Sequence, residues 1–89
     1  MNIIIPKDVK FVLSTLENYG YEAFVVGGCV RDYLLGLSPS DWDICTNAHP
    51  DSVCEVFKNH NVIKSGISHG TITLIYNKKP YEITTYRSD

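Results

Sequence analysis

Apolar residues recur at intervals of three or four positions in two parts of the chain. The first pattern predicts an amphipathic helix between Pro6 and Gly20, because residues at this spacing share one face of a helix. The second predicts a helix over 50–58, and a short helix is expected over 30–35 before a capping glycine. The helix that follows Pro6 has its apolar residues at Val9, Val12, Leu13 and Leu16, and the helix over 50–58 has them at Val53, Val56 and Phe57.

Short runs of β-branched and aromatic residues predict five strands. They cover 22–26, 41–46, 62–64, 71–76 and 81–86. The first run is continuously apolar and is expected to be buried. Residues 77–80 suit a hairpin turn, and 65–70, which are rich in glycine and serine, are expected to be flexible. The order of elements predicts an α/β (α+β) fold, in which a mixed, largely antiparallel sheet carries its helices on one face.

Composition narrows the class of protein. The 89 residues are enough for one domain at most, and 44% of them are hydrophobic, as in an ordinary globular protein. The net charge of −2 argues against a nucleic-acid binder that acts alone, which would normally be basic. The three cysteines lack the spacing of zinc ligands, and no apolar run reaches the ~18–20 residues of a membrane span. We therefore expect a cytoplasmic protein with reduced thiols and no membrane partner.

A glycine pair follows the first predicted strand and precedes the short helix. Gly27 and Gly28 would let backbone N–H groups approach an anion closely, and the start of the helix would favour the same anion. Arg31, one turn later, could make a bidentate contact with a phosphate. The plainer alternative is a tight turn in which Arg31 pairs with a neighbouring carboxylate. The stretch is thus a candidate site for a nucleotide phosphate.

Two carboxylates lie two residues apart on the second predicted strand. Asp41 and Asp43 would leave the same face, with Cα atoms about 6.5 Å apart, and could bind divalent ions of the kind used in nucleotidyl transfer. Magnesium suits such a site, because it takes few protein carboxylates and completes its shell with water and phosphate. A pair of solvated turn residues is the commoner meaning of an isolated Asp-x-Asp.

Two weaker candidates lie further along the chain. Glu82, on the last predicted strand, could help to hold the metal or orient an attacking hydroxyl; the alternative is an exposed strand residue. His69 and Gly70 belong to the glycine-rich stretch, where the histidine could touch a substrate or simply lie in a loop. None of the three histidines is spaced with a cysteine as a metal site would require.

These motifs, taken in order, resemble the catalytic head of the bacterial-type (class II) CCA-adding tRNA nucleotidyltransferases and their poly(A) polymerase relatives. The stretches that carry the resemblance are VGGCVRD at 26–32, LG at 35–36, DWDICT at 41–46, HGTIT at 69–73 and YEITTYR at 81–87. The resemblance extends over nearly the whole chain, and the order of the motifs makes it specific.

The resemblance implies a DNA-polymerase-β-like nucleotidyltransferase fold. It implies that Asp41 and Asp43 are catalytic and hold Mg²⁺, that Glu82 matches a further carboxylate of the family, and that Gly27, Gly28 and Arg31 bind the triphosphate of CTP or ATP. The reaction would be attack of a tRNA 3′-hydroxyl on the α-phosphate with release of pyrophosphate. The segment that ends at His69 matches a mobile loop linked to the switch from CTP to ATP.

The chain also departs from the family. Members are several times longer and carry Arg-Arg-Asp and Glu-Asp-x-x-Arg motifs that are absent here, together with further helical regions that grip tRNA. Residues 1–89 are therefore expected to be a single, partial head domain, with the neck, body and tail regions of the family absent. Little base selection is expected of it, and the activity of the isolated chain is left open.

Two other functions stay open at this point. One keeps the superfamily and changes the substrate: a poly(A) polymerase head, or another small nucleotidyltransferase. The other is a folding or binding fragment without catalytic activity. The CTP or ATP preference and the oligomeric state are not determined by the motifs.

Overall fold

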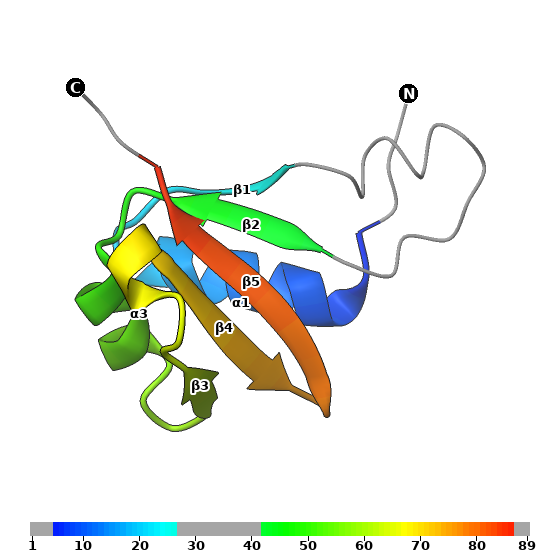
Figure 1. The fold of residues 1–89 in the computed structure, drawn as a ribbon. Coiled ribbons are helices and arrows are strands. Elements are labelled where there is room, and N and C mark those ends of the chain that lie inside the picture. Colours follow the sequence, from blue (N-terminus) through cyan, green and yellow to red (C-terminus); the bar gives the residue numbers. More distant parts are fainter. Residues whose placement is uncertain (1–4, 27–41, 87–89) are drawn as a thin grey trace.

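A computed structural model of the chain describes residues 5–26 and 42–86. They form a five-stranded sheet in the order β1-β2-β5-β4-β3, with both helices on the same side of it (Figure 1). The strands are β1 (Ala23–Val26), β2 (Asp43–Thr46), β3 (Asn61–Ile63), β4 (Thr71–Tyr76) and β5 (Lys79–Thr85). The helices are α1 (Lys7–Asn18), α3 (Pro50–Val56) and the 3₁₀ turn η1 (Ile67–His69). The helix expected over 30–35 lies outside the described residues.

The sheet is mixed and largely antiparallel, as expected. β2 pairs with β5 in parallel at the centre, while β1–β2, β3–β4 and β4–β5 are antiparallel pairs. A parallel pair needs a long connection, and here α3, β3 and β4 lie between β2 and β5 in the chain. The central parallel pair therefore brings together two segments that are far apart in the sequence.

The two helices follow the predicted pattern. α1 begins after Pro6 with Asp8 in its first turn, and the chain turns at Gly20, whose φ of +90° suits glycine. Val9, Val12 and Leu16 of α1 are buried against the sheet. α3 has a proline in its first turn and is shorter than the predicted 50–58, but its apolar residues are buried as expected.

The β4–β5 hairpin turn is tighter than predicted. Only Asn77 and Lys78 form the turn, both with positive φ (51° and 65°), as two-residue hairpin turns favour. The expected turn over 77–80 is thus wrong at its end, because Lys79 and Pro80 belong to β5. Proline fits there because, within the described residues, the pairing of β5 with β2 begins only at Glu82.

Two further expectations need revision. β1 was expected to be a buried strand, but it lies at the edge of the described sheet and its Phe24 is 51% exposed. Helix α1 covers one face only, so residues on the other face stay accessible.

The stretch 65–70 contains the hydrogen-bonded turn η1, in which the His69 N–H donates to the Gly66 carbonyl at 3.0 Å. Its mobility stays a prediction.

The core lies between the helices and one face of the sheet. Its buried hydrophobic residues are Val9, Val12, Leu16, Trp42, Ile44, Ala48, Val53, Val56, Phe57, Ile72, Leu74, Tyr81 and Ile83. Thr46 is the buried polar residue beside them; its hydroxyl donates to the Glu22 carbonyl at 2.6 Å and accepts from the Ala48 N–H at 3.2 Å. Neither described helix is long and apolar enough to cross a membrane. No described helix covers the opposite face of the sheet, where the site residues lie.

Candidate functional site

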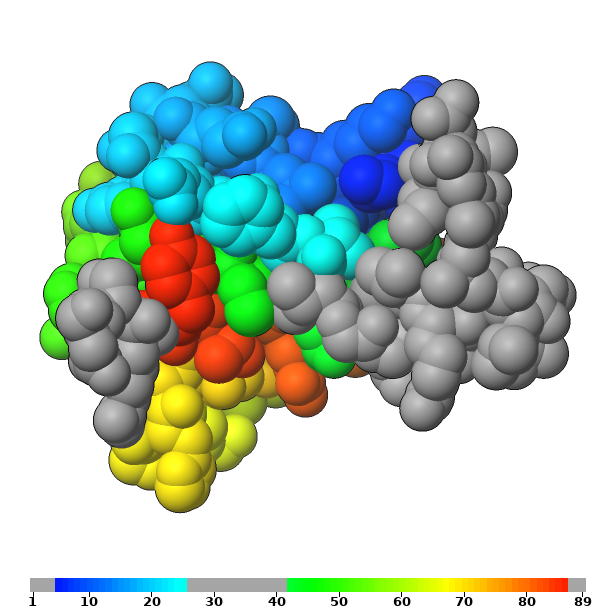
Figure 2. Space-filling model, turned by 90° about the horizontal axis from the view of Figure 1, so that it is seen from above, coloured from blue at the N-terminus to red at the C-terminus, as the bar shows by residue number. Residues whose placement is uncertain are grey.

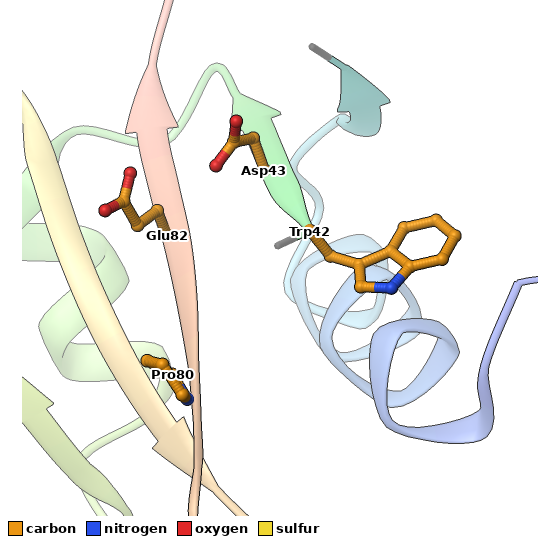
Figure 3. A pocket seen from close by; sticks show the side chains of 4 residues that line it. All are labelled: Trp42, Asp43, Pro80 and Glu82. Atoms are coloured by element: carbon orange, nitrogen blue, oxygen red, sulfur yellow. The ribbon is translucent and has the colours of Figure 1, made fainter. Parts of the chain in front are cut away.

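Two of the predicted carboxylates lie side by side at the centre of the sheet. Asp43 of β2 is the register partner of Glu82 of β5, and neighbouring strands are about 4.8 Å apart. The flanking Ile44 and Ile83 are fully buried on the helix side, so the alternation of a strand directs Asp43 and Glu82 to the other face. Figure 3 shows both carboxylates on the same side of the two strands.

A pocket of about 300 Å³ lies at this pair and is lined by Trp42, Asp43, Pro80 and Glu82 (Figure 3). Glu82 is exposed and Asp43 is half-buried, so a ligand can reach both carboxylates. The Trp42 indole lies away from them, toward α1, and is buried in the core. The pocket thus holds two carboxylates that a ligand can reach.

The charge of the pair favours a cation. Within residues 5–26 and 42–86, neither Asp43 nor Glu82 has an ion-pair partner or a side-chain hydrogen bond. Like charges directly opposite each other destabilise a sheet, and a bound cation removes that cost. No described group of three or more acidic, histidine or cysteine side chains could hold a metal. Two carboxylates nevertheless fit Mg²⁺, which commonly uses one or two together with substrate phosphates.

Several predicted site residues lie outside the described part of the chain: Gly27, Gly28, Arg31 and Asp41. The structure does place the residue before the glycine pair, because Val26 is the register partner of Asp43. β1 is antiparallel to β2, so the chain leaves β1 toward the N-terminal end of β2. The roles of these four residues stay predictions.

The structure does not bring His69 and Gly70 to the carboxylates. Gly70 follows η1 with φ +80°, and its carbonyl accepts from the Thr85 N–H at 2.8 Å. Thr71, the next residue, pairs with Thr84, which is two positions beyond Glu82 on β5. His69 is exposed at that end of the sheet, and its predicted role in a flexible loop stays a prediction.

An aromatic pair on the same open face was missed by sequence reasoning. The rings of Phe24 and Tyr86 are 6.3 Å apart, and Phe24 pairs with Cys45, two residues from Asp43. The Tyr86 hydroxyl donates to the Glu22 carboxylate, and this hydrogen bond raises the pKa of Tyr86 above 10.0. The alternation of side chains in 22–26 could have predicted that Phe24 points to the face opposite Ala23 and Val25. Only the pairing of β1 with β2 shows that Phe24 lies near Asp43.

Comparison with known proteins identifies the family. Residues 23–89 match the model of the Poly A polymerase head domain. The chain belongs to this family. The expected family and fold are therefore confirmed.

The head domain is similar to curated CCA-adding enzymes. It is 50% identical over 78 residues to those of Lactobacillus delbrueckii subsp. bulgaricus and Lactobacillus helveticus, covering 88% of this chain and 19% of each relative. It thus spans about a fifth of the length of these relatives.

The fold is also similar to solved structures of CCA-adding enzymes. The Bacillus stearothermophilus CCA-adding enzyme in complex with CTP matches with a TM-score of 0.86 and 37% identity, over 96% of this chain and 22% of that one. A CCA-adding enzyme with ATP matches with a TM-score of 0.75 and 25% identity, over 94% of this chain and 22% of that one.

Proposed function

We propose that the chain is the catalytic head of a CCA-adding tRNA nucleotidyltransferase. The attacking tRNA 3′-oxygen forms a bond to the α-phosphorus of CTP or ATP, the bond from that phosphorus to the bridging oxygen breaks, and pyrophosphate leaves. The observation that carries the proposal is the pairing of Asp43 with Glu82 on the open face of this fold. The resemblance to an enzyme described in complex with CTP supports the nucleotide substrate.

The two carboxylates have the central role in this proposal. Asp43 and Glu82, together with Asp41, would hold Mg²⁺, which when bound neutralises charge on the phosphates and polarises the reacting phosphoryl group. Glu82 is the more exposed of the described pair, and it would accept a hydrogen bond from the attacking hydroxyl.

The triphosphate would lie beside the start of β2. Gly27 and Gly28 follow Val26, the partner of Asp43, so backbone N–H groups of the glycine pair would bind phosphate near the carboxylates. Arg31 would add a bidentate contact to the same phosphates. His69 and Gly70 would belong to the loop that takes part in the change from CTP to ATP.

The remaining expectations about the domain are part of the same proposal. Residues 1–89 would form one head domain that acts in the cytoplasm with CTP or ATP and the tRNA 3′ end as partners. Cys45 and Cys54 are free thiols, as a reducing compartment favours.

Metal and nucleotide binding test the proposal. Mn²⁺, which substitutes for Mg²⁺ and broadens nearby NMR signals, should broaden the amide signals of Asp43 and Glu82 first, and MgCTP or MgATP should shift signals of the same strands. Asp43→Asn should weaken Mn²⁺ binding by about tenfold or more, because loss even of a group that only supports a metal ligand costs 10- to 100-fold. Asp51→Asn, an exposed acid on α3, is the matched control and should change nothing.

The same experiment separates the alternatives. If wild-type and Asp43→Asn chains bind Mn²⁺ equally, the carboxylate pair is no metal site and the non-catalytic fragment is favoured. The description of the family as a Poly A polymerase head favours poly(A) synthesis as a second candidate function. Product length decides between the two reactions: three added nucleotides indicate CCA addition, and long adenosine tails indicate poly(A) synthesis.

A further inference from the structure

The open face of the sheet continues beyond the carboxylate pair to an aromatic surface. We call Phe24 and Tyr86 the aromatic pair. Figure 2 shows strand β1, in cyan, beside the end of the β5 segment, in red, on the surface of the molecule. Between the carboxylates and the aromatic pair lie Cys45 and Thr84, which are register partners on β2 and β5.

The aromatic pair combines an exposed ring, Phe24, with a half-buried ring, Tyr86, that is held in place. Phe24 is 51% exposed, although it belongs to a strand with both neighbours half-buried. Tyr86 is fixed from two sides, because its N–H donates to the Thr46 carbonyl at 3.0 Å and its hydroxyl donates to Glu22. The rings are inclined at 38°. A fixed, accessible aromatic surface binds a flat partner at little cost in conformational entropy.

The distance of the aromatic pair from the carboxylates can be estimated from the rise per residue along the strands. Cys45, which pairs with Phe24, is two residues beyond Asp43, a separation of about 7 Å along the strand. Tyr86 is four residues beyond Glu82, about 13 Å at the same rise per residue. The aromatic pair therefore lies about one or two nucleotides away from the carboxylates.

The side of Asp43 on which the aromatic pair lies favours the acceptor strand, and not the incoming nucleotide, as its ligand. The chain leaves β1 at Val26 toward the N-terminal end of β2. The proposed function expects the next two residues, the glycine pair, to bind the triphosphate at that end. The aromatic pair lies on the opposite side of Asp43, toward the C-terminal end of β2. An incoming nucleotide whose phosphates are bound toward the N-terminal end of β2 leaves the C-terminal end free for the RNA acceptor that is being extended.

We propose that Phe24 and Tyr86 form a stacking surface for a base of the single-stranded acceptor, one or two nucleotides before its reacting 3′ end. Stacking on an exposed aromatic ring is a common way to bind single-stranded nucleic acid without reading its sequence. The Tyr86 hydroxyl and its partner, the Glu22 carboxylate, give the surface a polar edge, which suits a heteroaromatic base better than an apolar protein segment. The inference rests on the proposed function, since it needs the acceptor's 3′ end at Asp43 and Glu82.

A fluorescent RNA tests the inference. The probe is a short single-stranded RNA with 2-aminopurine as the base before its 3′-terminal nucleotide, titrated with the 89-residue chain and Ca²⁺ so that no reaction consumes it. Wild-type chain should quench the fluorescence by stacking. Phe24→Leu and Tyr86→Leu should each weaken binding about fivefold or more, the lower end of what one stacked base contributes. Tyr86→Phe keeps the ring but loses the hydrogen bond to Glu22, so it should bind more tightly than Tyr86→Leu.

Matched controls keep the result specific. Tyr19 is 59% exposed at the end of α1, so Tyr19→Leu removes an equally accessible ring elsewhere and should leave RNA binding unchanged. Mn²⁺ and CTP binding of Phe24→Leu should match wild type, because Phe24 is not a ligand of either. Circular dichroism and a thermal melt check that each variant is folded, which the exposure of Phe24 favours.

Three results would overturn the inference. The first is unchanged RNA affinity in Phe24→Leu, and the second is absence of quenching by a wild-type chain that binds Mn²⁺ and CTP. The third is a dimer in sedimentation that Phe24→Leu dissociates, which would assign the aromatic pair to a contact between two copies of the chain. Loss of Mn²⁺ and CTP binding in the wild-type chain is a different result, because it would remove the proposed function itself.

Discussion

The two faces of the sheet differ sharply although the same strands build both. On β2 and β5, Ile44 and Ile83 are completely buried under the helices, and Asp43 and Glu82, one residue before each, lie on the face that no described helix covers. The alternation of side chains in a strand makes this possible, because adjacent residues point to opposite faces. One pair of central strands therefore supplies both the core and the candidate site.

Fold stability and the proposed chemistry depend on different faces of the sheet. The helix face contains apolar residues at high density, and its polar member Thr46 has its hydrogen bonds satisfied. The open face contains an exposed aromatic ring and two carboxylates that have no ion-pair partner among the described residues, groups that bind partners better than they stabilise a fold. Substitutions on the two faces should thus change different measured quantities.

The largest expected effect is on the helix face. Ile83→Ala should lower the free energy of unfolding by about 2–5 kcal/mol, because it removes buried methyl groups and leaves a cavity. Ile63→Ala deletes the same atoms on the open face, where the side chain is 46% exposed, and should cost less than about 1 kcal/mol. Urea denaturation of the two variants measures the contrast. Equal losses would mean that the open face is covered in solution.

A smaller effect is expected where α1 contacts the hairpin. The Tyr81 hydroxyl and the Asn77 amide donate to the two oxygens of the Asp8 carboxylate, at 3.2 and 2.9 Å. Tyr81→Phe removes one of these hydrogen bonds from a ring that is 5% exposed, and should cost about 0.5–1.5 kcal/mol at neutral pH. Tyr19→Phe, at an exposed ring, is the control and should be neutral.

The same variant should also change the dependence of stability on pH. Burial, and then the Asp8 carboxylate, raise the pKa of Tyr81 above 10.0, so the folded state retains the phenol proton at a pH where the unfolded chain loses it. The resulting stabilisation is complete below about pH 10 and is lost as pH rises through the raised pKa. As pH rises above 10.0, wild type should therefore lose stability more steeply than Tyr81→Phe, and parallel curves would contradict this assignment.

The smallest effect on stability, and of opposite sign, is expected at the site. Without divalent metal, Glu82→Gln should raise the free energy of unfolding by up to about 1 kcal/mol, because it removes the repulsion between Glu82 and Asp43. Glu55→Gln removes an exposed acid paired with Lys58 at 3.5 Å and should lower stability slightly. Thermal melts in EDTA compare the two. Marked destabilisation by Glu82→Gln would show that the open face contributes to the fold after all.

Much of the local structure could be predicted from the pattern of residues. The apolar positions of α1 and α3 and the alternation of Asp43 with Ile44 and of Glu82 with Ile83 follow from the periods of helix and strand, and all were confirmed. The bounds of β4 matched residue for residue. The predictions were wrong where a neighbouring element decides the outcome. Phe24 is exposed because β1 lies at the edge of the described sheet and no described helix covers its face. Pro80 fits in β5 because, within the described residues, β5 pairs with β2 only from Glu82 onward.

Which residues could do chemistry, and to which side of its own strand each points, can be read from the amino-acid pattern because both properties are local. Which of these residues meet depends on how the strands pair. The parallel register of β2 with β5 places Asp43 beside Glu82, and the C-terminal end of the same ladder places Tyr86 beside Phe24. Register depends on how the helices pack on the whole sheet and on the turn between β4 and β5, and no short stretch of sequence contains that information.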